Sequence, residues 1–291
     1  MSFTPRGIIA AMVTPLREDY RLDEEATRTL IDFLIEGGIH GLFVAGTSGE
    51  FYGLSPEDRK RLLEVSVEQS AGRVPVYGGV DGITTQEAIK NLKIAESCGV
   101  EAVSVLTPMF INPTQEELYL HYKAIAEATD LSILAYNNPP KTGISLASST
   151  VARLSEIENI VGVKDSSGDF TLMSEYIRLT RGKDFSVLAG RDTLIYGGLC
   201  YGGAGAITAC ANLIPRTMAD IYDKFVAGDM EGALEAQYAC APVRMAFSLG
   251  SYPSILKEGL KILGIDVGPC FPPVGSMSDQ SKQKLTSILL P

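Results

Sequence analysis

Residues 159–170 read NIVGVKDSSGDF, and the apolar run from Ile160 to Val163 ends directly on Lys164. Short runs that are apolar at consecutive positions are typical of parallel strands buried on both faces. Similar runs occur at residues 8–13, 41–44, 74–78, 102–106, 132–136, 185–189 and 205–208. Segments with helical spacing separate them, and eight strands each followed by a helix predict a (β/α)8 TIM barrel, an α/β fold.

Helix start signals support this alternation, and the strand signal stops after residue 210. Ser55-Pro56 combines a capping serine with a first-turn proline, and Thr84 and Thr114 each precede a glutamate by three residues. Helical stretches follow at residues 214–226, 230–249, 252–263 and 278–289. We therefore expect a barrel over residues 1–225 and a C-terminal helical extension over 226–291 packed on it. An open doubly wound sheet is the alternative, but G-x-G-x-x-G does not follow the first strand.

Composition excludes several classes of partner. The net charge of −10 argues against nucleic acid and against an anionic membrane surface, and no apolar run is long enough to span a bilayer. Five scattered cysteines without C-x-x-C, and an N-terminus without a signal peptide, indicate a cytoplasmic protein. Only two histidines occur, far apart, so we expect no metal. We expect no cofactor either, since no phosphate cup accompanies the lysine as pyridoxal phosphate would require.

Lys164 stands where barrel enzymes place catalytic groups, at the carboxyl end of a strand. Burial disfavours the charged form of an amine, so a buried lysine can supply a neutral nucleophile. Such an amine forms an imine with a 2-oxo acid, and the imine is an electron sink for carbon–carbon bond chemistry. The alternative is a lysine that reaches water and pairs with Asp165.

Two further strand ends fit the same chemistry. The loop GTSGE at 46–50 offers backbone N–H groups and the hydroxyls of Thr47 and Ser48 to a carboxylate. Tyr136 ends another strand, where its phenol can relay protons. Taken singly, the loop could be an ordinary polar connection and Tyr136 a tyrosine at the barrel lip with a satisfied hydroxyl. Together with Lys164 they indicate one site.

The motifs GTSGE at 46–50, YNNP at 136–139 and VGVKDSSGD at 161–169 resemble the dihydrodipicolinate synthase / N-acetylneuraminate lyase family of class I pyruvate-dependent aldolases. The resemblance runs from Gly7 to Leu289. It implies a cofactor-free homotetramer, a dimer of dimers, that acts on pyruvate or another 2-oxo acid and an aldehyde. It also implies the roles of six residues: Lys164 as the Schiff-base lysine, Tyr136 as the proton relay, Thr47 and Ser48 as the carboxylate site, and Gly190 and Ile207 as site lining.

Three positions bear on the second substrate. Phe110 corresponds to a tyrosine that passes protons to the relay in these enzymes, and phenylalanine cannot do so. Lys141 stands where dihydrodipicolinate synthase has an arginine for the carboxylate of its aldehyde substrate, and it provides charge without bidentate geometry. Arg191 is a candidate replacement for that arginine. The alternative for Arg191 is a surface ion pair with Asp192.

Three functions therefore remain open. The first is a dihydrodipicolinate synthase-like lyase. The second is a 4-hydroxy-2-oxo acid or 2-keto-3-deoxy sugar-acid aldolase or dehydratase, since KDSSGD and the late GPC at 268–270 also resemble the 4-hydroxy-2-oxoglutarate aldolase branch. The third is a non-catalytic oxo-acid sensor on the same scaffold. The pair of Lys164 and Tyr136 argues against the sensor, which does not need an imine-forming amine.

Overall fold

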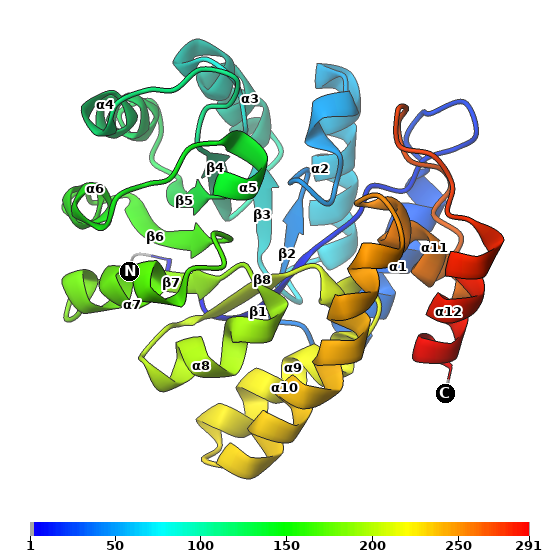
Figure 1. The fold of residues 1–291 in the computed structure, drawn as a ribbon. Coiled ribbons are helices and arrows are strands. Elements are labelled where there is room, and N and C mark those ends of the chain that lie inside the picture. Colours follow the sequence, from blue (N-terminus) through cyan, green and yellow to red (C-terminus); the bar gives the residue numbers. More distant parts are fainter. Residues whose placement is uncertain (1–2, 291) are drawn as a thin grey trace.

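The computed structural model describes residues 3–290 and contains a closed barrel of eight parallel strands (Figure 1). The predicted fold class is therefore confirmed. Each strand pairs with the next in sequence, and the last closes on the first. The strands are β1 (Gly7–Ala11), β2 (Gly41–Val44), β3 (Val76–Gly79), β4 (Ala102–Leu106), β5 (Ser132–Asn137), β6 (Ile160–Asp165), β7 (Ser186–Ala189) and β8 (Gly205–Thr208).

Helices cover the outside of the barrel (Figure 1). Those between the strands are α1 (Glu24–Glu36), α2 (Pro56–Ser70), α3 (Thr85–Ser97), α4 (Gln115–Ala126), the short α5 (Pro139–Thr142), α6 (Ser148–Leu154), α7 (Phe170–Thr180) and α8 (Ile195–Cys200). Within residues 3–290 no helix is both long and apolar enough to cross a membrane.

The predicted caps position three of these helices. The Ser55 hydroxyl accepts a hydrogen bond from the Asp58 N–H, and Thr114 forms a complete capping box with Glu117. Thr84 caps α3 through the Glu87 N–H, but the Glu87 carboxylate accepts from the N–H of Ile83 instead of closing the box.

Alternation along the strands separates two apolar cores. One lies between strands and helices, and the other fills the barrel interior with Ile9, Ala11, Phe43, Tyr77, Ala102, Leu134, Leu188 and Ile207. Close strand approach requires glycine at Gly205, where φ is +144° and an added Cβ would lie 2.1 Å from the Gly7 carbonyl oxygen. The floor of any site at the barrel mouth is therefore solid.

Three predicted strands match the structure at both ends, and the other five differ by one or two residues at an end. β3 begins at Val76 because Pro75 has no N–H to contribute to the ladder. β6 was expected to end at Val163 but continues through Lys164 and Asp165, which pair with Leu188 and Ala189 of β7. Lys164 therefore lies within a strand, held from both sides.

The chain ends in α9 (Pro215–Val226), α10 (Met230–Met245), α11 (Ser254–Ile262) and α12 (Asp279–Leu289). In Figure 1, α10 lies along α9, and α12 lies beside α11. The helix predicted over 230–249 ends at Met245 and tightens into a 3-10 turn over Ala246–Leu249, and the next helix begins at Ser254. The division into a barrel over 1–225 and an extension over 226–291 stays a proposal.

Candidate functional site

Lys164 points into the barrel mouth from β6. Its side chain is 4% exposed, and its Nζ lies 4.0 Å from the ring centroid of Tyr136 and 4.8 Å from that of Phe43. Gly162 precedes it on the same face of the strand, where any Cβ would lie 2.4 Å from the carbonyl oxygen of Ser186. The amine is thus surrounded by aromatic rings inside a packed barrel.

The alternative for Lys164, a lysine that reaches water and pairs with Asp165, does not agree with the structure. Asp165 instead accepts hydrogen bonds from the Asn137 amide and the Ser167 hydroxyl, both at 2.8 Å, and burial raises its pKa above the ordinary value. Successive residues on a strand face opposite ways, so Asp165 points away from the mouth. Across residues 3–290, no carboxylate forms an ion pair with the Lys164 amine.

Tyr136 is directly opposite Lys164 in the register between β5 and β6. Its hydroxyl accepts a hydrogen bond of 2.9 Å from the Asn138 side-chain amide and lies 3.4 Å from the hydroxyl oxygen of Thr47. The Asn138 amide nitrogen is a donor only, so the Tyr136 hydroxyl oxygen is the acceptor in this hydrogen bond. The phenol O–H therefore stays available to donate to another acceptor. This geometry suits a proton relay beside the amine.

Thr47 and Ser48 come from the loop after β2. The loop is held by the hydroxyl of Thr14, which follows β1 and donates to the Gly49 carbonyl at 2.6 Å, and it turns at Glu50 with φ +53°. The Ser48 hydroxyl forms a hydrogen bond with the hydroxyl of Tyr252. Two hydroxyls are therefore fixed at the mouth, each beside a tyrosine.

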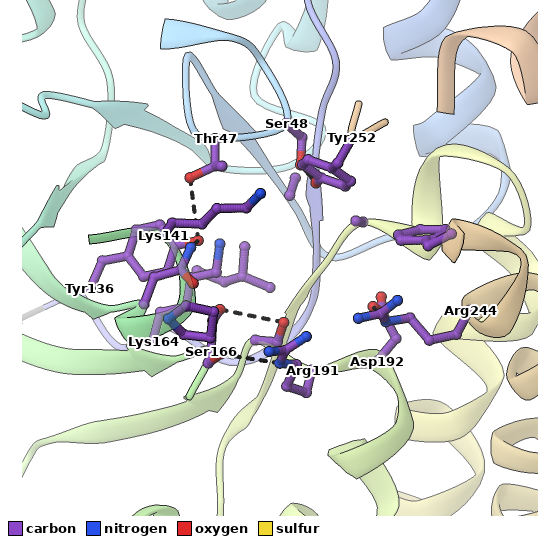
Figure 2. Close-up of a pocket in the computed structure, with 17 residues that line it drawn as sticks. Thr47, Ser48, Tyr136, Lys141, Lys164, Ser166, Arg191, Asp192, Arg244 and Tyr252 are labelled. Carbon is purple, nitrogen blue, oxygen red and sulfur yellow. Dashed lines mark hydrogen bonds and ion pairs between the residues drawn. The ribbon is translucent and has the colours of Figure 1, made fainter. Parts of the chain in front are cut away.

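A cavity of about 350 Å³ opens at this mouth (Figure 2). It brings together eight of the predicted site residues: Lys164, Tyr136, Thr47, Ser48, Gly190, Ile207, Lys141 and Arg191. It does not include Phe110, whose side chain is 93% exposed and whose φ is +75°. Phe110 was predicted to contact substrate, and in this chain it lies on the outer surface.

The charged residues on the β7 side do not form the surface ion pair that was the alternative for Arg191. Arg191 does not pair with Asp192; its Nε donates to the Ser166 carbonyl at 3.1 Å. Asp192 is buried, accepts from the Cys210 N–H at 3.0 Å and pairs with the Arg244 guanidinium at 3.2 Å. In Figure 2, Arg244 and Asp192 lie across the cavity from Lys164 and Tyr136. Cations on this rim can meet an anionic group at the far end of a substrate.

Several cavity residues were missed from the sequence. Asn138 is one position beyond Asn137 in the YNNP motif, and its place between Tyr136 and the proline could have marked it. Tyr252 and Arg244 belong to the C-terminal helical part, where no strand end indicates the mouth. The only sequence signal for Tyr252 is the Gly-Ser-Tyr-Pro stretch at 250–253, which predicts a break between helices.

Comparison with known proteins gives a consistent result. The dihydrodipicolinate synthetase family model matches residues 4–290. Curated relatives named 4-hydroxy-tetrahydrodipicolinate synthase include those of Methanothrix thermoacetophila, 37% identical over 98% of this chain and 96% of its own, and Archaeoglobus fulgidus, 38% identical over 97% and 96%.

Solved structures agree with the sequence relatives. Dihydrodipicolinate synthase from Thermotoga maritima superposes with a TM-score of 0.95 at 32% identity, covering 99% of this chain and 98% of its own. A prophage protein of the same family from E. coli K12, solved in complex with pyruvate, gives 0.94 at 28% identity, covering 98% and 97%. On the sequence match and the fold together, the chain belongs to the dihydrodipicolinate synthase family.

Proposed function

We propose that the protein is a Schiff-base lyase that joins pyruvate, or a closely related 2-oxo acid, to an aldehyde. The observation that carries the proposal is the Lys164 amine, buried without a carboxylate partner beside the Tyr136 phenol in a cavity that also holds Thr47 and Ser48. Relatives that share the whole chain are named 4-hydroxy-tetrahydrodipicolinate synthase, and one neighbour was solved with pyruvate bound.

The first chemical step is attack of the Lys164 amine nitrogen on the ketone carbon of pyruvate. Loss of water from the resulting adduct gives a protonated imine, which withdraws electrons from C3. Tyr136 can deliver the proton that the departing hydroxyl takes and can accept one as C3 becomes nucleophilic. C3 then adds to the aldehyde carbon, whose oxygen takes a proton, and hydrolysis of the imine by water releases the product and restores the Lys164 amine. The whole sequence in reverse cleaves a 4-hydroxy-2-oxo acid.

The carboxylate of the oxo acid needs donors on the other side of the ketone. Thr47 and Ser48 offer hydroxyls there, and hydrogen bonds to a carboxylate are among the stronger ones in proteins. Gly190 and Ile207 complete the floor of the site. At Gly190 a Cβ would lie 2.0 Å from the Ser166 hydroxyl oxygen, so only glycine leaves this wall open.

The aldehyde is proposed to be acidic, in keeping with the names of the relatives. Lys141 and Arg191 are on the rim of the cavity and can neutralise its carboxylate. A second candidate is a 4-hydroxy-2-oxo acid or 2-keto-3-deoxy sugar-acid aldolase or dehydratase. Two observations favour it: position 141 is a lysine, and the cavity is also lined by the polar side chains of Ser166, Asp192 and Arg244.

We also propose a cytoplasmic homotetramer, supported by five cysteines that are all free in the structure and by the family resemblance. A monomeric dihydrodipicolinate synthase variant is among the similar structures, so sedimentation equilibrium is needed to establish the assembly state.

Borohydride reduction in the presence of pyruvate tests the imine. We expect a mass increase on the peptide that contains Lys164, absent in Lys164→Met, and an unmodified peptide would refute the mechanism. Condensation of pyruvate with aspartate semialdehyde, beside cleavage of 4-hydroxy-2-oxo acids and 2-keto-3-deoxy sugar acids, then separates the two lyase candidates. Binding of pyruvate with neither trapping nor turnover would favour the sensor.

A further inference from the structure

Tyr252 contacts both halves of the cavity, although it lies between the 3-10 turn at Ala246–Leu249 and α11, in the C-terminal part of the chain. Its hydroxyl is bonded to the hydroxyl of Ser48, and its ring centroid lies 5.8 Å from the Nζ of Lys141 (Figure 2). Ser48 belongs to the proposed oxo-acid half of the site and Lys141 to the proposed aldehyde half. One side chain therefore links Ser48, in the loop after β2, with Lys141 of the short helix α5.

The hydroxyl contact has a direction that matters for carboxylate binding. A serine hydroxyl has one proton and can accept further hydrogen bonds through its lone pairs. Ser48 can donate to a carboxylate only if that proton is turned toward the cavity, and a donor placed behind its oxygen enforces this. Burial raises the pKa of the Tyr252 phenol, so Tyr252 remains protonated and can be that donor.

The ring contact concerns Lys141, whose side chain is otherwise exposed to solvent. A long flexible lysine loses rotamer freedom when it binds a ligand, and that loss weakens binding. An ammonium about 6 Å or less from the centroid of a tyrosine face is attracted by the ring. The Tyr252 ring can therefore hold the Lys141 amine over the cavity before the aldehyde arrives.

Tyr252 is itself held rigidly relative to the Ser48 loop. Three residues after the start of α11, the Lys257 amine pairs with the Glu50 carboxylate at 2.8 Å, two positions beyond Ser48. The other oxygen of Glu50 accepts from the Phe271 N–H at 2.8 Å. The loop and the C-terminal segment are thus joined at several points, so the distance between Ser48 and Tyr252 is fixed by the fold.

We infer that Tyr252 is a positioning residue for both substrates: its hydroxyl orients Ser48 toward the oxo-acid carboxylate, and its ring holds Lys141 toward the aldehyde. The inference rests on the proposed function, because it assumes that an oxo acid and an aldehyde occupy these two halves. It assigns to the C-terminal part of the chain a direct effect on substrate affinity, beyond covering the barrel.

Two variants separate the two contacts. Tyr252→Phe removes only the hydroxyl, so we expect the pyruvate concentration for half-maximal borohydride trapping on Lys164 to rise about three- to tenfold. In this variant, the KM for the aldehyde that the wild-type enzyme condenses with pyruvate is expected to stay within twofold of the wild-type value. Tyr252→Leu removes the ring as well, and both constants should rise. In neither variant should kcat fall as much as the affinities.

Tyr122→Phe is the matched control. Tyr122 is also a buried tyrosine, but its hydroxyl donates to the Val105 carbonyl at 3.0 Å, outside the cavity. Loss of a buried hydroxyl outside the cavity should lower stability but change neither the pyruvate concentration for half-maximal trapping nor the aldehyde KM. If Tyr252→Phe behaves like Tyr122→Phe, the orienting role of Tyr252 is refuted.

The wild-type protein separates failure of this inference from failure of the proposed function. No trapping on wild-type Lys164 refutes the proposed function. If wild type is trapped normally and Tyr252→Phe has the same half-saturating pyruvate concentration, the role of the Tyr252 hydroxyl is refuted while the proposed function stands. If the aldehyde KM is unchanged in Tyr252→Leu, the role of the Tyr252 ring in holding Lys141 is refuted. If Tyr252→Phe proves too unstable to assay at room temperature, trapping is repeated in the cold with Ser48→Ala and the double variant. Equal affinities in the double variant and Ser48→Ala support the coupling, and independent effects refute it.

Discussion

The Lys257 amine lies 2.8 Å from a Glu50 carboxylate oxygen, and these two side chains are 4% and 0% exposed. The amine also donates to the Pro269 carbonyl at 2.5 Å. A buried ion pair is sensitive to loss of one partner, because the remaining charge stays buried and uncompensated. Lys257→Met should therefore lower the free energy of unfolding by about 3–5 kcal/mol, measured by urea denaturation.

The matched comparison is Arg178→Ala, which breaks an exposed pair with Glu175 and should cost no more than about 1 kcal/mol. The double variant Glu50→Gln with Lys257→Met removes both buried charges and should be more stable than Lys257→Met alone. If it is less stable, the penalty does not come from the unpaired carboxylate.

Tyr136→Phe tests the proposed proton relay. Without the phenol proton, kcat should fall about 10²- to 10⁴-fold, the range for general acid–base catalysis, because imine formation and the step at C3 both need proton transfer. The adduct with pyruvate should still form on Lys164, only more slowly. Tyr176→Phe removes another buried hydroxyl, which donates to the Leu146 carbonyl away from the cavity, and should leave kcat unchanged. A kcat in Tyr136→Phe within tenfold of wild type would contradict the relay.

The site could be predicted from sequence as far as it depends on strand ends. In a parallel barrel every strand delivers its last residues to the same mouth, so Lys164, Tyr136 and the loop with Thr47 and Ser48 could be brought together without coordinates. Gly190 and Ile207 came only from the family resemblance, although they obey the same geometry. The register between β5 and β6, which sets Tyr136 directly opposite Lys164, follows from the structure alone.

The C-terminal contributions could not be predicted, for a physical reason. Ser48 and Tyr252 are 204 positions apart, and helical spacing predicts which face of a helix is buried without saying what covers it. Asp192 could have paired with its neighbour Arg191, yet it pairs with Arg244 on α10. Phe110 shows the converse: sequence correspondence placed it at the site, whereas the structure places its side chain outside this cavity.

Asp81 predicts an unusual pH dependence of stability. It follows β3, one oxygen accepts from the Leu106 N–H at 2.8 Å, and the other has no hydrogen-bond partner among the described residues. Burial raises its pKa from 3.8 to about 6. Between pH 3.8 and about 6 the folded state holds a proton on Asp81 that the unfolded state has lost. The contribution of Asp81 to the free energy of unfolding is therefore most favourable below pH 3.8, and it is lost as the pH rises through about 6.

Asp81→Asn should therefore be more stable than wild type at pH 7, by about 2–3 kcal/mol at roughly 1.4 kcal/mol per unit of pKa, with the difference vanishing near pH 4. Urea denaturation across this range measures it. His121, whose pKa burial lowers to about 4, contributes with the opposite sign, and comparison of the two proteins cancels its effect. A difference that does not change with pH would show that Asp81 does not titrate as expected.

Lys141 is the residue on which recognition of an acidic aldehyde is proposed to depend. Lys141→Gln removes the charge, and loss of one charge-assisted hydrogen bond should raise the aldehyde KM about 10- to 100-fold while pyruvate trapping is unchanged. Lys141→Arg keeps the charge and adds a planar fork that matches a carboxylate, so its KM should be at or below the wild-type value. Lys123→Gln, on the outer surface of α4, controls for loss of a lysine elsewhere. If Lys141→Gln raises the KM of an uncharged aldehyde as much as that of an acidic one, Lys141 does not bind the carboxylate. That result would favour a sugar-acid aldolase, in which the acceptor is held by contacts to its hydroxyl groups.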